Sequence, residues 1–131
     1  MQSDGDDHTV TNSYLDLRRE TSARDRSLRD KVMSLEEAAA LILDGDHVAL
    51  GGCTLSRTPM AMVWALIRAR KKDLIVSRSI TSTEGDLLYG SGVSRHILTS
   101  WFSQGIVWGV SKVMRYYTEN KLASFEEWSH M

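Results

Sequence analysis

The chain has 131 residues, of which 42% are hydrophobic and 25% charged, the proportions of one ordinary globular domain with a modest core. Its 16 basic and 17 acidic residues nearly cancel, which argues against a nucleic-acid-binding or membrane-binding surface. No apolar run is long enough to span a bilayer, and the acidic N-terminus lacks the pattern of a signal peptide. The single cysteine, Cys53, excludes an intrachain disulfide, so a reducing cytoplasm is the expected compartment.

Residues 1–33 differ from the rest of the chain in composition. Charged residues crowd this segment, whereas large apolar residues are few and scattered. Such a segment buries too little apolar surface to offset the entropy lost on ordering. We expect a mobile charged tail over residues 1–33, with a short helix somewhere within residues 14–30.

An ordered domain is expected over residues 34–131, and it opens with a capping box. Ser34 is placed to cap a helix, and Glu37 lies three positions later, where it can reach back to the cap. Apolar residues then recur at helical spacing as far as residue 42, and Gly45 favours a stop. The short apolar run 47–50, which ends at a glycine pair, is typical of a buried strand.

The remaining elements continue an alternation of helices and strands. Thr58 is predicted to cap the next helix, with Pro59 at its first position. The later segments are a strand at 74–76, a polar loop at 81–86 with a helical turn after it, a strand within 93–101 and a helix over 111–122. This order predicts an α/β fold with an open, mostly parallel sheet, flanking helices and about three strands.

A metal site is not expected. The four histidines, His8, His47, His96 and His130, are far apart in the sequence and form no ligand spacing with Cys53.

The pair Gly51-Gly52 lies between a predicted strand and a predicted helix, which is where phosphate-binding turns occur. Neither the dinucleotide-binding glycine pattern nor the lysine-containing nucleotide loop is present. Two explanations of the pair therefore carry equal weight: a close approach of the backbone to a ligand, or a tight turn. The adjacent Cys53 could be activated by Arg57, but the sequence offers no histidine partner, so a structural cysteine is favoured.

Glu84 is predicted to lie in the loop after the second strand, at the end of the sheet where open α/β folds bind ligands. A carboxylate there could act as an acid or a base. A glutamate in a polar loop is also commonly solvated or a residue at the start of a helix, and the neighbouring Asp86 could simply cap the turn that follows.

Several segments, taken in order, resemble the opening of A-type subunits of family I CoA-transferases, and within them the glutaconate CoA-transferase group. The likeness covers about residues 31–131 and rests on the series rather than on one motif. It is carried by Ser34-Leu35-Glu36-Glu37-Ala38, Asp44-Gly45-Asp46-His47-Val48-Ala49, Gly51-Gly52-Cys53, Arg57-Thr58-Pro59-Met60-Ala61, Glu84-Gly85-Asp86-Leu87-Leu88 and Phe125-Glu126-Glu127-Trp128-Ser129.

This resemblance implies a function and a partner. Such enzymes move CoA between an acyl thioester and a carboxylic acid through a glutamyl-CoA intermediate, and coenzyme A is a substrate rather than a bound cofactor. The acting glutamate is expected on a B-type partner subunit, so this chain alone should be inactive. The resemblance would place Gly51, Gly52, Cys53 and Arg57 near the thioester.

The resemblance also leaves alternatives open. A-type subunits continue well beyond the position of Met131, so the chain is expected to be a truncated product or a fragment. Some relatives are hydrolases that open rings of CoA-linked compounds with a glutamate on the A-type chain, and Glu84 is the candidate for that role here. A non-catalytic remnant that only pairs with a partner is a third possibility.

Overall fold

The computed structural model describes residues 13–52 and 54–129, and the chain divides into two units, one up to Val32 and one from Met33 on. The described part of the first unit contains the helix α1 (Tyr14–Ala23), none of whose residues is buried. This helix lies inside the range where the sequence predicted one. The mobility expected for residues 1–33 stays a prediction, and residues 1–12 lie outside the described residues.

The second unit is an α/β layer built on parallel strands. Four strands form a sheet in the order β1-β2-β4-β6, and β3 and β5 form a second ladder; every pairing is parallel. The elements are α2 (Leu35–Ala40), β1 (His47–Ala49), α3 (Met60–Arg68), β2 (Leu74–Ser77), β3 (Ile80–Thr81), α4 (Thr83–Ser91), β4 (Ser94–Thr99), β5 (Trp101–Phe102), α5 (Lys112–Glu119) and β6 (Ser124–Glu127). The predicted α/β fold with a parallel sheet and flanking helices is confirmed.

Serine side chains cap the N-termini of α2 and α5. The capping box is present: the Glu37 backbone N–H donates to Ser34 Oγ at 3.2 Å, and the Ser34 N–H donates to Glu37 Oε2 at 2.8 Å. Ser111 Oγ likewise accepts the Met114 N–H at 2.9 Å. The helix predicted after Thr58 is present as α3, but its predicted cap was wrong. Pro59 occupies the cap position, and the Thr58 hydroxyl donates instead to the Thr54 carbonyl at 2.7 Å.

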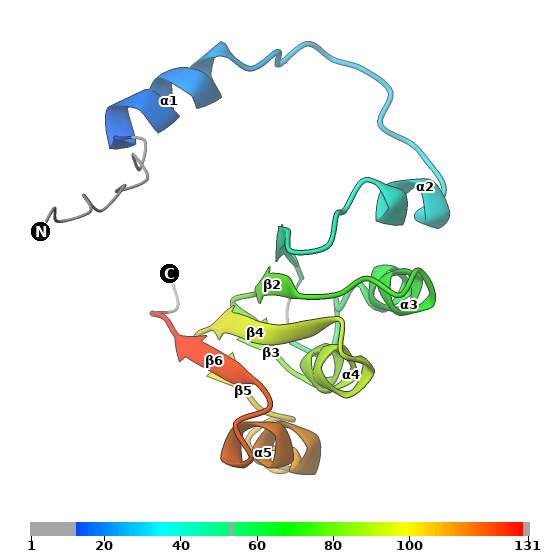
Figure 1. Cartoon of the computed structure of the whole chain (residues 1–131), viewed down its shortest axis with the longest axis vertical. Helices are drawn as coiled ribbons and strands as arrows, with labels where there is room; N and C mark the ends of the chain where they lie inside the picture. Colours follow the sequence, from blue (N-terminus) through cyan, green and yellow to red (C-terminus); the bar gives the residue numbers. More distant parts are fainter. Residues whose placement is uncertain (1–12, 53, 130–131) are drawn as a thin grey trace, which may run out of the picture. The chain divides into compact units, whose positions relative to one another are not determined.

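The core lies between the sheet and three helices. α3, α4 and α5 lie along the same side of the sheet (Figure 1). Alternate residues of the central strands point toward them, because side chains along a strand alternate between its two faces. Val76, Ile97 and Leu88 are among the fully buried side chains that fill this layer.

Backbone pairing between the chain after β2 and the chain after β4 continues beyond the ends of these two strands. The Ser100 N–H donates to the Ser79 carbonyl at 3.0 Å, and the Ser103 N–H donates to the Thr81 carbonyl at 3.1 Å, so the pairing runs on into β3 and β5. Gly85 of α4 packs directly on this extension, since a Cβ there would lie 2.4 Å from the Phe102 ring and from Thr81 Cγ2.

The sequence expectation of about three strands was wrong, since the described residues form six. In the four-stranded sheet the missed strand is β6, and the two-residue strands β3 and β5 were not predicted either. All four residues of β6 are exposed, so the segment carries neither an apolar run nor a buried alternation. Side-chain contacts attach it to β4: His96 Nδ1 lies 2.8 Å from Ser124 Oγ, and Nε2 lies 3.2 Å from Glu126 Oε1. Such contacts depend on the strand register, which single-segment patterns do not contain.

Among the described residues, no helix combines the length and apolar character needed to cross a membrane.

Candidate functional site

The candidate site lies at the edge of the sheet where the strands end. Because the strands are parallel, the segments that follow β1, β2 and β4 all emerge at this edge, and open α/β folds bind their ligands there. The segment after β1 runs from Leu50 to Pro59 and contains the glycine pair. The segment after β2 begins with Arg78, and the segment after β4 begins with Ser100.

The two glycines of this edge have different surroundings. Gly52 has φ +109°, and a Cβ there would lie 1.9 Å from the Arg57 carbonyl oxygen, so the turn itself requires glycine. A Cβ on Gly51 would meet no described atom within 4 Å. Both glycines and the Arg57 side chain are exposed. Cys53 lies outside the described residues, and its structural role stays a prediction.

A buried ion pair lies beneath this turn. The guanidinium of Arg78 pairs with the carboxylate of Glu84, and only about 1% of each side chain is exposed. Arg78 Nη2 also donates to the Thr54 carbonyl at 2.9 Å and to Thr58 Oγ1 at 3.3 Å. Arg78 therefore joins the segment after β1 to the first turn of α4.

Glu84 belongs to the first turn of α4 rather than to a polar loop. Its Oε1 accepts the Ser82 backbone N–H at 2.9 Å, which caps the helix from within, and a carboxylate also suits the positive end of the helix dipole. Oε2 is buried and finds no hydrogen-bond partner within the described part of the chain. The sequence placed this glutamate at the correct edge of the sheet and left open a position at the start of a helix, which is where it lies. The polar loop predicted over residues 81–86 is helical from Thr83, and the carboxylate is buried rather than solvated.

Arg78 is the residue of this site that the sequence analysis did not single out. Directly after a short strand, an arginine is most simply interpreted as solvent-exposed, and its partner Glu84 is separated from it by β3. The only local signal was a strongly basic residue at the ligand-binding edge of a parallel sheet.

Asp86 links α4 to the segment before α5. Its carboxylate accepts hydrogen bonds from Ser111 Oγ at 2.5 Å and from Gln104 Nε2 at 2.7 Å. Burial raises the pKa of Asp86 above its ordinary value, although the hydrogen bonds from Ser111 and Gln104 oppose that rise. The sequence suggested a helix-capping role, whereas the side chain contacts a different segment.

Two cavities adjoin the segment after β1. One, of about 460 Å³, lies along the strand ends and is lined by Leu50, Arg78 and Trp128 among others. The other, of about 260 Å³, is lined by Thr54 and Leu55 together with residues of β3, β5 and the segment after β5. Gly51 and Gly52 therefore lie in the stretch of chain between the linings of these two cavities.

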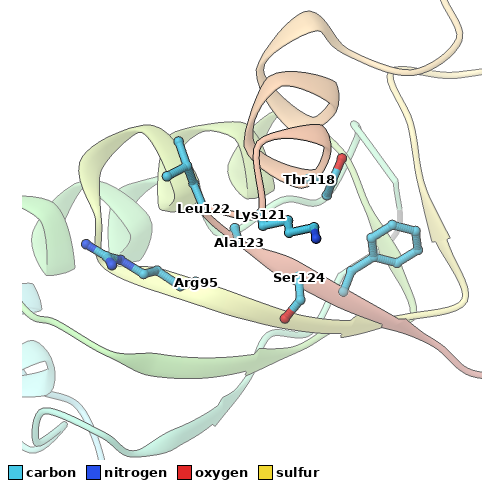
Figure 2. A pocket seen from close by; sticks show the side chains of 7 residues that line it. Arg95, Thr118, Lys121, Leu122, Ala123 and Ser124 are labelled. Carbon is cyan, nitrogen blue, oxygen red and sulfur yellow. The ribbon is translucent and has the colours of Figure 1, made fainter.

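A third cavity, of about 490 Å³, lies at the opposite edge, where β4 and β6 begin. It has two cationic side chains in its lining, Arg95 and Lys121. Figure 2 shows these side chains pointing in opposite directions, so they do not converge on one anion. This cavity is also remote from the strand ends, and we do not assign the site to it.

Within residues 13–52 and 54–129, no cluster of three His, Cys, Asp or Glu side chains could hold a metal ion. His8, His130 and Cys53 lie outside the described residues.

The fold is that of a CoA-transferase family. A family model described as Coenzyme A transferase matches residues 32–130, and the chain therefore belongs to this family.

Its relatives include a subunit of a glutaconate CoA-transferase. The chain is 32% identical over 100 residues to the A subunit of glutaconate CoA-transferase from Acidaminococcus fermentans, which covers 76% of this chain and 31% of that protein. The crystal structure of glutaconate coenzyme A-transferase from Acidaminococcus fermentans matches with a TM-score of 0.70 at 31% identity, over 77% of this chain and 32% of the other. A variant of the decarboxylase AibA/AibB matches with a TM-score of 0.65 at 27% identity, over 74% and 38%. The chain thus spans about a third of the length of these relatives.

Proposed function

We propose that this chain is part of the A-type subunit of an acyl-CoA:carboxylate CoA-transferase. The observation that carries the proposal is the exposed Gly51-Gly52 turn at the strand ends, between two cavities, in a chain of the coenzyme A transferase family. The relative named as the A subunit of a CoA-transferase supports the same class.

The proposed reaction proceeds through covalent intermediates on a glutamate of a B-type partner subunit. That carboxylate attacks the acyl thioester carbonyl, and CoA leaves as a thiolate while a mixed anhydride forms. The thiolate then attacks the glutamyl carbonyl of the anhydride, which releases the first carboxylate and leaves a glutamyl-CoA thioester. The acceptor carboxylate reverses these steps and departs as the new acyl-CoA. Each step is easier than direct exchange between thioester and acid.

In this reaction our chain contributes backbone donors and a binding surface. Each attack places negative charge on the oxygen of the attacked carbonyl, and for the acyl thioester preorganised N–H groups stabilise it. The turn at Gly51 is suited to this task because it is exposed and unobstructed on the side where a Cβ would project. The exposed Arg57 is available to the phosphate groups of CoA, for which a guanidinium is a strong partner. Cys53 belongs to the same proposed binding segment.

The test is a CoA-exchange assay on the complex that contains this chain and its B-type partner. Labelled carboxylate should enter the acyl-CoA pool, and borohydride should trap the glutamyl-CoA thioester on the partner. If the complex assembles but shows neither exchange nor trapping, the proposal is contradicted.

Hydrolysis of a CoA-linked substrate is the second candidate, with Glu84 as its acid or base. It is favoured by the buried Oε2 atom, which has no hydrogen-bond partner in the described chain. Against it stands the pairing of the same carboxylate with Arg78, which must open before water or substrate can reach it. Substitution Glu84→Gln in a complex shown to be folded decides between the two: a hydrolase loses turnover, whereas a transferase with its glutamate on the partner retains it.

A non-catalytic remnant is the third candidate, and the same assay addresses it. A remnant would bind the B-type partner and support neither exchange nor hydrolysis.

A further inference from the structure

We propose that the acyl group handled at this site is apolar and uncharged beyond its thioester, and that the 260 Å³ cavity beside the glycine turn receives it. This inference rests on the CoA-transferase function proposed above. It assigns a substrate class that differs from glutaconate, the dicarboxylate in the name of the relative.

The lining of the cavity is apolar and aromatic. Leu55, Ile80, Trp101 and Ile106 contribute hydrocarbon surface, and the other lining residues are a glycine and residues with small hydroxyl side chains. None of the described residues that line it carries a charge. Ligand sites of this kind bind hydrocarbon through the lining and fix its orientation with a few polar groups.

The hydroxyl of Ser103 is already engaged by the backbone. It donates to the Gly109 carbonyl at 3.0 Å and accepts the Gly105 N–H at 3.0 Å. The hydroxyl therefore holds the wall of the cavity in place and is not free to bind a ligand. Its contribution to a second substrate carboxylate would therefore be small.

Arg78 does not supply a cation that could pair with a second carboxylate of the substrate. Its guanidinium is paired with Glu84 and also donates to Thr54, so its charge is neutralised inside the protein. A substrate with a second carboxylate in this cavity would lose its hydration without gaining a counter-ion, which is strongly unfavourable. A hydrocarbon chain has no such cost.

The position and size of the cavity fit an acyl group. Thr54 and Leu55 belong to the segment that carries Gly51 and Gly52, so the cavity adjoins the turn and is within reach of the acyl chain of a thioester held there. At about 30 Å³ for each water-sized group, the volume holds about eight such groups, enough for a short chain.

Two thioesters of similar length test the inference, butyryl-CoA and glutaryl-CoA, with labelled acetate as acceptor for the complex. We expect kcat/KM for butyryl-CoA to exceed that for glutaryl-CoA by about tenfold or more. Equal values, or a preference for glutaryl-CoA, would overturn the inference. If neither thioester is turned over, the transferase function fails, and calorimetric titration of both thioesters into the same complex then decides the cavity preference by itself.

A cation placed in the cavity wall provides the matched variant. Leu55 is 55% exposed, so Leu55→Arg should fold, and it should shift the butyryl-to-glutaryl ratio toward glutaryl-CoA by about tenfold. The control is Leu41→Arg, an exposed leucine of the same unit that lines none of the cavities described above. An equal weakening of both thioesters by Leu55→Arg would instead place the pantetheine arm of CoA in the cavity and would overturn the inference.

Discussion

The guanidinium of Arg78 pairs with the carboxylate of Glu84 inside the protein, with about 1% of each side chain exposed. Because Arg78 also binds the Thr54 carbonyl, the pair connects α4 to the segment that carries the glycine turn. A buried ion pair is costly to assemble, but removal of one partner costs more because it leaves the other charge uncompensated.

We therefore expect Arg78→Met to lower the free energy of unfolding by about 3–5 kcal/mol. The double variant Arg78→Met with Glu84→Gln should recover much of this loss, because no buried charge remains. Urea denaturation measures all three proteins. The control is Arg19→Met, which removes the exposed pair with Asp16 at 3.4 Å and should cost less than about 1 kcal/mol. If Arg78→Met and Arg19→Met lower the free energy of unfolding equally, the buried pair contributes no more to stability than the exposed pair.

The two glycines of the turn should separate folding from function. Gly52→Ala is expected to destabilise the protein, because φ is +109° and the new Cβ would overlap the Arg57 carbonyl. Gly51→Ala should leave stability within about 1 kcal/mol, since its Cβ meets no described atom within 4 Å. Thermal unfolding and CoA exchange are measured on both variants.

Activity in Gly51→Ala then tests the thioester role. A folded variant with reduced exchange supports an approach of the substrate to the turn, whereas unchanged exchange leaves the glycine pair as a tight turn only. The larger substitution Gly52→Val is less informative, because the structure predicts loss of packing together with any loss of turnover.

An alanine at Gly85 should destabilise the protein, whereas an alanine at Gly90, in the same helix, should not. A Cβ at Gly85 would lie 2.4 Å from the Phe102 ring, so Gly85→Ala should force α4 away from β5 and cost about 1–3 kcal/mol. Gly90 is exposed and its Cβ would meet no described atom, so Gly90→Ala should be neutral or stabilising by up to about 1 kcal/mol. Denaturation midpoints of the two variants provide the comparison, and equal effects would contradict the packing described for α4.

The pH dependence of stability should contain a contribution from Asp86. Burial raises the pKa of Asp86 in the folded protein, so the folded state holds this proton more tightly than the unfolded state. Its contribution to stability is therefore greatest at low pH and is lost as the pH rises through the raised pKa. Relative to Asp86→Asn, the wild type should gain stability as the pH falls from about 7 to 4. Denaturation of both proteins across this range measures the difference, and a difference that is constant with pH would contradict the prediction.

The fold could be predicted from the sequence where each element contains its own signal. The Ser34 capping box, the helix within 111–122 and the apolar run in β2 are local, and the structure confirms each. β6 was missed because its residues are exposed and its place in the sheet depends on the partners of His96 in β4. Long-range register is not a property of any short segment.

The candidate site was likewise predicted only where its position follows from local sequence patterns. The glycine turn and Glu84 were placed at the correct edge of the sheet because strand ends can be inferred from strand positions. The role of Arg78 could not be predicted, because its burial depends on how the segment after β1 folds over it. The family resemblance indicated the reaction, and no residue pattern indicated the apolar cavity around Leu55.

The last prediction concerns the 131-residue chain purified alone, which we expect to self-associate and to lack CoA-transfer activity. Four apolar side chains of one stretch are at least 44% exposed, namely Trp101, Ile106, Val107 and Trp108, whereas Phe102 is buried. Apolar surface of this kind seeks a partner, and the strands β1 and β6 at the two ends of the sheet order can also pair with another chain.

Light scattering on the isolated chain, with a CoA-exchange assay on the same sample, measures both halves of this prediction. The double variant Ile106→Ser with Trp108→Ser should reduce association, because it removes side chains that are 88% and 79% exposed. The matched control is Leu41→Ser with Leu43→Ser, which removes two leucines that are 70% and 64% exposed between α2 and β1. A monodisperse wild-type monomer with turnover of its own would contradict the prediction. Neither a B-type partner nor a further covering chain would then be needed, and the acting glutamate would have to belong to this chain.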